Sequence, residues 1–209
     1  RRRLELLDWA QAADAFVLED DYDSEYRYAG RPLAALQGLD ENGRVIYVGS
    51  FSKVMFPGIR IGYMVAPKPL VGPFRAIRRL LDSHPSSIAQ AALADFITEG
   101  YLTSHIRRMR ALYEERQTYF LETVRAVLGD RLQIEPDEAG MHLVGYLPDG
   151  ADDAALSKRA AATGVVALPL SAFYREAPDK KGLLFGYAGV SKTETRRAVE
   201  RLASAFSKD

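Results

Sequence analysis

Cysteine is absent from this 209-residue chain, and tryptophan occurs only once. The absence of cysteine excludes disulfides, thiolate metal sites, iron–sulfur clusters and a cysteine nucleophile, and it favours a cytoplasmic protein. The chain also lacks an excess of either charge, because 28 basic residues balance 28 acidic ones. This balance gives the segment no electrostatic attraction of its own to nucleic acid or to an anionic membrane.

Long apolar runs are missing as well. None approaches the roughly 20 residues that cross a bilayer, and the arginine-rich residues 1–5 lack the apolar stretch of a signal peptide. We therefore expect neither a membrane span nor a membrane partner. An initiator methionine is also absent, which suggests that the sequence is part of a longer protein.

With 47% hydrophobic and 27% charged residues, the chain has the composition of a globular protein. Its first hundred residues contain short apolar runs without alternation, which is typical of parallel strands covered by helices on both faces. We therefore predict an α/β fold with a mostly parallel sheet and flanking helices. The predicted elements, in chain order, are a helix at 1–13, strands at 15–19, 44–49 and 59–66, and helices at 67–82 and 85–100.

The hydrophobic pattern changes in the second half of the chain. It predicts a long amphipathic helix over 104–128, then short strands and a helix, and a final helix that begins with a capping box at Ser191 and Glu194. These elements suit a small α+β domain. We therefore expect two domains, an α/β one over residues 1–100 and a small α+β one over residues 101–209.

Three polar clusters lie at the ends of the predicted strands, at residues 19–25, 50–53 and 57–63. Ligands of open α/β sheets bind in the crevice beyond the strand ends, so we expect the three clusters to converge on one site. The serines and the arginine there suit a phosphate group, because arginine offers a fork of donors and serine donates its hydroxyl proton. Lys53, at the edge of an apolar segment, suits an amine that attacks a carbonyl carbon.

Two other interpretations of these clusters remain open. One is a magnesium site of a phosphoryl-transfer enzyme, built from Asp20, Asp21, Asp23 and Glu25. It is disfavoured because the sequence has no glycine-rich phosphate loop, and because it leaves residues 50–53 unexplained. We therefore expect no metal. The other interpretation is a dimerisation module that binds no ligand.

The order of the motifs resembles the class I/II aminotransferases, which are fold-type I pyridoxal 5′-phosphate enzymes. Their pattern is an Asp-x-Tyr strand end, then Ser-x-Ser-Lys, then Gly-x-Arg-x-Gly-Tyr, and this chain has these motifs at residues 20–22, 50–53 and 58–63. Residues 19–28 and 105–110 are similar, more narrowly, to the MocR group of GntR-type transcriptional regulators. Those proteins join an N-terminal DNA-binding domain to an aminotransferase-like domain, and this chain resembles the C-terminal part of that second domain.

The resemblance implies pyridoxal 5′-phosphate as the cofactor and a role for each motif residue. Lys53 is implied to bond covalently to the cofactor aldehyde, Asp20 to keep the pyridine nitrogen protonated, and Tyr22 to hydrogen-bond the phenolic oxygen. The residues implied to hold the phosphate are Ser50, Ser52 and Arg60. We expect Asp21, Asp23 and Glu25 to be caps or surface charges.

The resemblance also implies a function. The favoured one is an effector domain of a MocR-like regulator, in which the cofactor and an amine or amino-acid ligand change domain closure and thereby DNA binding by a domain outside this chain. The alternative is an aminotransferase that passes an amino group from an amino acid to a 2-oxo acid. A homodimer is implied in both.

The chain departs from the family pattern in two respects. The first half of the large domain, which completes the cofactor site in the family, is not in this chain. Leucines stand at Leu183 and Leu184, where the family usually has an arginine for the substrate carboxylate.

Overall fold

The computed structural model describes residues 1–176 and 178–206, which fold into two compact units. Unit 1 contains Arg1–Glu25 and Gly30–Arg107, whereas unit 2 contains Tyr26–Ala29 and the chain from Arg108 onward. The chain therefore crosses from one unit to the other after residues 25, 29 and 107.

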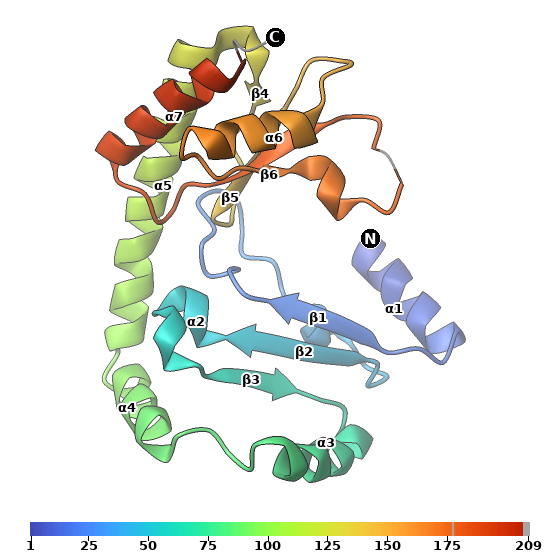
Figure 1. Cartoon of the computed structure of the whole chain (residues 1–209). Coiled ribbons are helices and arrows are strands. Elements are labelled where there is room, and N and C mark those ends of the chain that lie inside the picture. Colours follow the sequence, from blue (N-terminus) through green and yellow to red (C-terminus); the bar gives the residue numbers. More distant parts are fainter. Residues whose placement is uncertain (177, 207–209) are drawn as a thin grey trace. The chain divides into compact units, whose positions relative to one another are not determined.

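Unit 1 is built around a three-stranded sheet with the strand order β1-β2-β3 (Figure 1). The strands are β1 (Val17–Asp21), β2 (Val45–Ser50) and β3 (Gly62–Val65). The helices are α1 (Arg2–Ala12), α2 (Phe51–Val54), α3 (Lys68–Leu81) and α4 (Ser87–Thr98), with 3-10 turns η1 (Gln37–Leu39) and η2 (Pro57–Ile59) between them.

The first two strands pair in parallel, as their unbroken apolar runs predict, with Asp20 opposite Val48. The third strand differs from the predicted mostly parallel sheet, because β3 runs antiparallel to β2 with Ser50 opposite Gly62. It also begins later than the predicted residue 59, because residues 57–59 form η2. The segment between β2 and β3 is shorter than the crossover of about a dozen residues that a parallel connection requires, so the chain turns back on itself.

The sheet of unit 1 is covered unevenly. On one face, Leu7 of α1 packs in a buried cluster with Leu36 and Val45. On the opposite face, Leu18 is 66% exposed and Met64 is 47% exposed. All four residues of β3, which alternate between the two faces, are exposed. The burial on both faces that the sequence predicts is therefore not reached within the described residues.

Unit 2 is an antiparallel sheet packed with helices, the α+β arrangement predicted for the second half (Figure 1). Its strand order is β4-β5-β7-β6. The strands are β4 (Gln133–Ile134), β5 (His142–Tyr146), β6 (Leu168–Pro169) and β7 (Gly182–Gly186), and the 3-10 turns are η3 (Gly129–Arg131) and η4 (Leu170–Phe173). The helices are α5 (Tyr101–Leu128), whose first turns belong to unit 1, α6 (Asp153–Ala162) and α7 (Lys192–Phe206).

The core of unit 2 joins α5 to the sheet and to α7. The rings of Phe120 and Phe185 lie 5.5 Å apart, and Val124, Leu183 and Leu202 are almost completely buried. Burial of five such side chains stabilises the unit by about 1.5–3 kcal/mol each.

The start of α7 confirms the predicted capping box. The Ser191 N–H donates to the Glu194 carboxylate over 3.0 Å, and the Glu194 N–H donates to Ser191 Oγ over 3.3 Å. The helix buries Val199, Leu202 and Ala205, whereas the hydrophobic spacing of the sequence predicts burial of Val199, Leu202, Ala203 and Phe206.

A four-residue segment of the first half, Tyr26–Ala29, is part of unit 2. Tyr26 is fully buried, and its ring meets that of Tyr113 edge-on with centroids 4.8 Å apart. The Tyr28 hydroxyl donates to the Gly140 carbonyl over 2.6 Å. The chain thus passes through unit 2 at this segment and returns to unit 1 at Gly30.

Two helix starts differ from the sequence-based expectations. The fourth helix begins after Ser86, whose hydroxyl accepts from the Ala89 N–H, and not at Pro85. The fifth begins at Tyr101, directly after Gly100, whose positive φ of 78° ends the preceding helix.

No helix in the described part of the chain has both the length and the hydrophobicity that a membrane crossing requires.

Candidate functional site

The three polar clusters lie along one edge of the unit 1 sheet. The parallel pairing of β1 and β2 places the ends of both strands at this edge, with Asp21 opposite Gly49. Because β3 is antiparallel, it starts at the same edge, where Gly62 pairs with Ser50. Arg60 therefore lies at this edge because it precedes the start of an antiparallel strand. The sequence pattern predicted this position for a different reason, the meeting of parallel strand ends.

The end of β1 sorts its residues onto two faces. Side chains alternate along a strand, so Glu19 and Asp21 lie on one face and Asp20 on the other. Asp20 is exposed, and so is Tyr22, which follows the strand directly and is 41% exposed. This alternation agrees with the sequence prediction that Asp20 and Tyr22 share a side.

The acids on the opposite face are hydrogen-bonded within the protein. Glu19 accepts from the backbone N–H groups of Leu36 and Gln37 over 2.7 and 2.9 Å. Asp21 accepts from the hydroxyls of Tyr47 and Ser24 over 2.8 and 2.7 Å. These two carboxylates are thereby tied to the fold, as expected of structural acids.

Tyr22 is held in its protonated form by the charges around it. The negative charge of Asp23 raises the pKa of the Tyr22 phenol, and partial burial and Asp20 raise the pKa further. A neutral phenol keeps its proton to donate, so Tyr22 is a suitable donor to an anionic oxygen.

The end of β2 leads directly into the short helix α2. Ser50 occupies the N-cap, and its Oγ accepts from the Ser52 N–H over 3.1 Å, which leaves the Ser50 hydroxyl proton to donate. By alternation from Val48, Ser50 lies on the same face as Asp20. Lys53 follows within the helix and is exposed.

Arg60 is joined to the serine segment through the backbone. The Phe51 N–H, between the two serines, donates to the Ile61 carbonyl over 3.0 Å. Arg60 itself has φ 51° and ψ 35°, a left-handed conformation that non-glycine residues rarely adopt. Such strained positions concentrate at functional sites, where the surrounding structure maintains them.

The described residues give no support to the magnesium interpretation. Across residues 1–176 and 178–206, no group of three or more His, Asp or Glu side chains is arranged to hold a metal ion.

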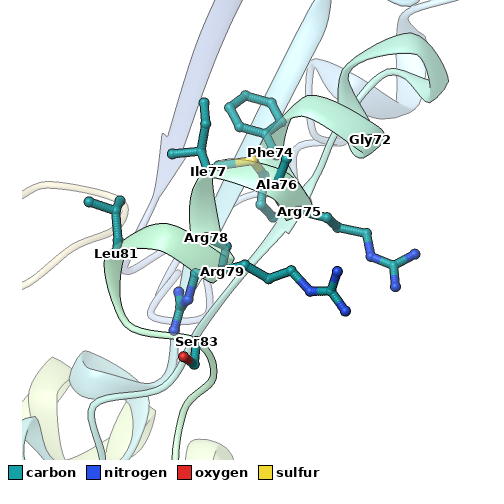
Figure 2. A pocket seen from close by; sticks show the side chains of 10 residues that line it. Gly72, Phe74, Arg75, Ala76, Ile77, Arg78, Arg79, Leu81 and Ser83 are labelled. Carbon is teal, nitrogen blue, oxygen red and sulfur yellow. The ribbon is translucent and has the colours of Figure 1, made fainter.

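A pocket of about 790 Å³ lies elsewhere in unit 1. It is an open groove along α3 that Met64 also lines, and none of its lining residues is a predicted site residue. Figure 2 shows Phe74 and Ile77 projecting to the same side of α3 in this groove. Three arginines and Ser83 line it beside the apolar side chains, but it has no acid and no lysine, so we place the candidate site at the sheet edge, where acids, serines, a lysine and an arginine occur together.

Sequence reasoning gave no role to the aromatic residues that support this edge, although Tyr63 is the last residue of the motif at 58–63. The Tyr63 ring covers Gly49, where any Cβ would overlap it, and it lies 6.0 Å from the ring of Tyr47 and 5.5 Å from that of Phe51. The available signal was the alternation in β2, which places Tyr47 on the face of Asp21.

Comparison with known proteins identifies the family. Residues 4–202 match the family of class I and II aminotransferases. The chain belongs to this family. The aminotransferase resemblance seen in the motifs is therefore confirmed.

Among the relatives of this aminotransferase-family chain are transcriptional regulators. The chain is 46% identical, over 98% of its length, to the probable rhizopine catabolism regulatory protein MocR of Rhizobium meliloti, and it covers 41% of that protein. It is 40% identical, over 99% of its length, to the HTH-type transcriptional regulator YhdI of Bacillus subtilis, and it covers 44% of that protein. The chain thus spans less than half the length of these two relatives.

Solved aminotransferases share its fold. A kynurenine aminotransferase of Pyrococcus horikoshii, solved in complex with PMP, superposes with a TM-score of 0.87 at 33% identity, over 99% of this chain and 51% of that one. This similarity confirms the predicted fold class, the C-terminal part of a fold-type I aminotransferase.

Proposed function

We propose that this chain is the C-terminal part of a pyridoxal-phosphate-binding, aminotransferase-like effector domain in a longer MocR-type transcriptional regulator. The observation that carries the proposal is the gathering, at one sheet edge, of Asp20 with Tyr22, the serine–lysine segment of β2 and α2, and Arg60. The similarity to the regulator MocR supports the regulatory role. The proposed partners are an amine or amino-acid ligand, a second copy of the protein, and DNA bound by a domain outside this chain, in the cytoplasm.

The residues present fit the chemistry of this cofactor. Pyridoxal phosphate supplies an aldehyde that combines with amines and a ring that accepts electrons. In the proposal, Lys53 provides the amine that holds it covalently, and Asp20, exposed on the sheet face of Ser50, pairs with the protonated ring nitrogen. The neutral phenol of Tyr22 donates to the anionic ring oxygen.

The phosphate is assigned to the group at the end of β2. Ser50 and Ser52 donate their hydroxyl protons, and Arg60 supplies the positive charge and paired donors that a dianion requires. The left-handed backbone of Arg60 interrupts the extended path of the chain that leads into β3.

The test of cofactor binding uses the full-length regulator, because the relatives extend well beyond this chain. The protein is loaded with pyridoxal phosphate, reduced with borohydride, digested and mapped by mass spectrometry. We expect the label on Lys53 and its loss in Lys53→Ala, with Lys68→Ala, an exposed lysine on α3, as the matched control. A label on another lysine, or full labelling of Lys53→Ala, would contradict the proposal.

A second candidate, an aminotransferase, is favoured by the similarity to solved aminotransferases. Both candidates load Lys53, but only the enzyme releases a 2-oxo acid from an amino acid. Incubation of the loaded full-length protein with amino acids separates them: catalytic release of oxo acid supports the enzyme, and a ligand-dependent change in DNA binding without it supports the regulator.

A further inference from the structure

The face of the sheet opposite Asp20 carries a hydrogen-bonded cluster whose members have no role in the proposed cofactor site. Its members are Asp21, Ser24, Tyr47 and Tyr63. We propose that Tyr47, through Asp21, is a positioning residue that fixes the end of β1 and thereby the direction of Asp20. This inference rests on the proposed cofactor site.

The geometry of β1 couples the two acids. Asp20 and Asp21 are adjacent on an extended strand, so fixing the side chain of one toward its face fixes the other toward the opposite face. A rotation or register shift at this point would exchange them. The pairs with Val48 and Gly49 are the last of the β1 ladder, so the backbone beyond Asp21 lacks further strand pairing.

Side-chain bonds to Asp21 replace that pairing. One carboxylate oxygen accepts from Tyr47 Oη at 2.8 Å and Ser24 Oγ at 2.7 Å, and the other from the Ser24 N–H at 3.2 Å. The Tyr47 bond links the end of β1 to the middle of β2, and the Ser24 bonds close the turn that follows. Hydrogen bonds to a charged group are stronger than neutral ones, which suits them to hold a strand end.

The phenol of Tyr47 is built to remain a donor. Burial raises its pKa well above the ordinary value, and hydrogen bonding with Tyr63 and Asp21 raises it further. The Tyr63 ring lies over Gly49 on the same face, so a side chain at that position would displace the ring from its place beside Tyr47. The glycine is therefore part of the support.

The test compares Tyr47→Phe with Tyr101→Phe, which removes an exposed phenol from the start of α5 as the matched control. In the loaded full-length protein, we expect Tyr47→Phe to release the cofactor about three to ten times faster, as the loss of one hydrogen bond of ordinary strength allows. The pH at which the visible band changes is expected to rise, because the Asp21 charge is then less compensated. In cofactor-free protein, amides of residues 20–25 are expected to exchange faster.

A second pair of variants protects the test against misfolding. Asp21→Asn keeps one acceptor oxygen for Tyr47 and is expected to release the cofactor more slowly than Asp21→Ala, which is expected to behave like Tyr47→Phe. At Asp20 the amide is not expected to rescue, because a neutral group cannot pair with a protonated ring nitrogen.

The inference would be overturned if Tyr47→Phe matched the parent protein in its rate of cofactor release, in the pH at which the visible band changes, and in amide exchange. Equal loss in Asp21→Asn and Asp21→Ala would also overturn it. If the parent itself takes no label on Lys53, the proposed function fails instead, and the amide exchange of residues 20–25 alone decides whether Tyr47 holds the strand end.

Discussion

At the scale of single residues, Arg60 combines a strained backbone with the role proposed for it in binding the phosphate. Its φ of 51° costs an arginine about 1–2 kcal/mol relative to an ordinary backbone conformation. Within its motif, glycines stand at Gly58 and Gly62, but the residue with the strained backbone is the arginine. Glycine would adopt this conformation without strain. An arginine at such a position is therefore expected to be needed for its side chain, which is proposed to bind the phosphate.

We therefore predict opposite effects for one substitution. Arg60→Gly is expected to leave the free energy of unfolding unchanged or to raise it by up to about 1 kcal/mol, because glycine adopts positive φ without strain. The same change is expected to weaken pyridoxal-phosphate retention at least about tenfold in the full-length protein, because the fixed cation is lost. Urea unfolding and cofactor titration measure the two effects.

Arg60→Lys is the control for this prediction, because it keeps the charge and the backbone strain but loses the forked donors. It is expected to bind more weakly than the parent and more tightly than Arg60→Gly. Destabilisation by Arg60→Gly, or undiminished retention, would show that the arginine serves the fold.

At the scale of elements, a buried carboxylate joins three pieces of unit 2. Asp153, in the first turn of α6, is 1% exposed. It accepts from the N–H and hydroxyl of Ser171 in η4 over 2.9 and 2.7 Å, and from the Gly182 N–H at the start of β7 over 3.4 Å. One side chain thus satisfies backbone donors of a turn and a strand.

Removal of this carboxylate is expected to destabilise the protein. Asp153→Ala leaves the buried N–H groups of Ser171 and Gly182 without their acceptor, and we predict a loss of about 2–4 kcal/mol in the free energy of unfolding. Asp153→Asn keeps an acceptor oxygen and is expected to lose less. Urea unfolding at neutral pH checks the order, and an alanine variant as stable as the parent would contradict it.

The stabilisation by Asp153 also depends on pH in a definite direction. Burial raises the pKa of Asp153, but the hydrogen bonds from Ser171 and Gly182 outweigh it, and the net pKa lies below the ordinary value of 3.8. A carboxylate whose pKa is lowered by folding stabilises the folded state at pH values above its unfolded-state pKa. This stabilisation is lost as the pH falls through the lower, folded-state pKa. The difference in stability between the parent and Asp153→Asn is therefore expected to shrink below about pH 4.

The elements also show how far sequence reasoning reached. The apolar runs predicted β1 and β2, and the Ser191 and Glu194 spacing predicted the start of α7, because these signals are local. The direction of β3 was missed, because it depends on the length of the connection and not on the strand itself. The bond from Tyr47 to Asp21 was missed for a similar reason, since it depends on the register between two strands.

At the scale of the whole molecule, unit 1 leaves large apolar side chains exposed that its own helices do not cover. Around the turn between α3 and α4, Leu80 is 87% exposed, Leu81 78% and Ile88 81%. Leu18 and Met64 are exposed on the sheet. Large exposed apolar patches are characteristic of interaction surfaces or of aggregation.

We predict that the isolated 209-residue chain associates in solution. Sedimentation at low micromolar concentration is expected to show species larger than a monomer, and a dye that reports exposed apolar surface is expected to bind. Leu80→Glu combined with Ile88→Glu should reduce both signals, whereas Leu4→Glu, an exposed change on α1, serves as the matched control. A monomer that binds no dye would contradict the prediction.

The return of Tyr26–Ala29 into unit 2 has a consequence for how such a molecule can be inherited. The two units are whole in space but interleaved along the gene, because four codons of the second lie inside the stretch that encodes the first. No single crossover between parental genes can exchange one unit intact. A crossover between residues 107 and 108 would pair the buried Tyr26 of one parent with Tyr113 of the other, so such an exchange requires the two parents to match at this contact.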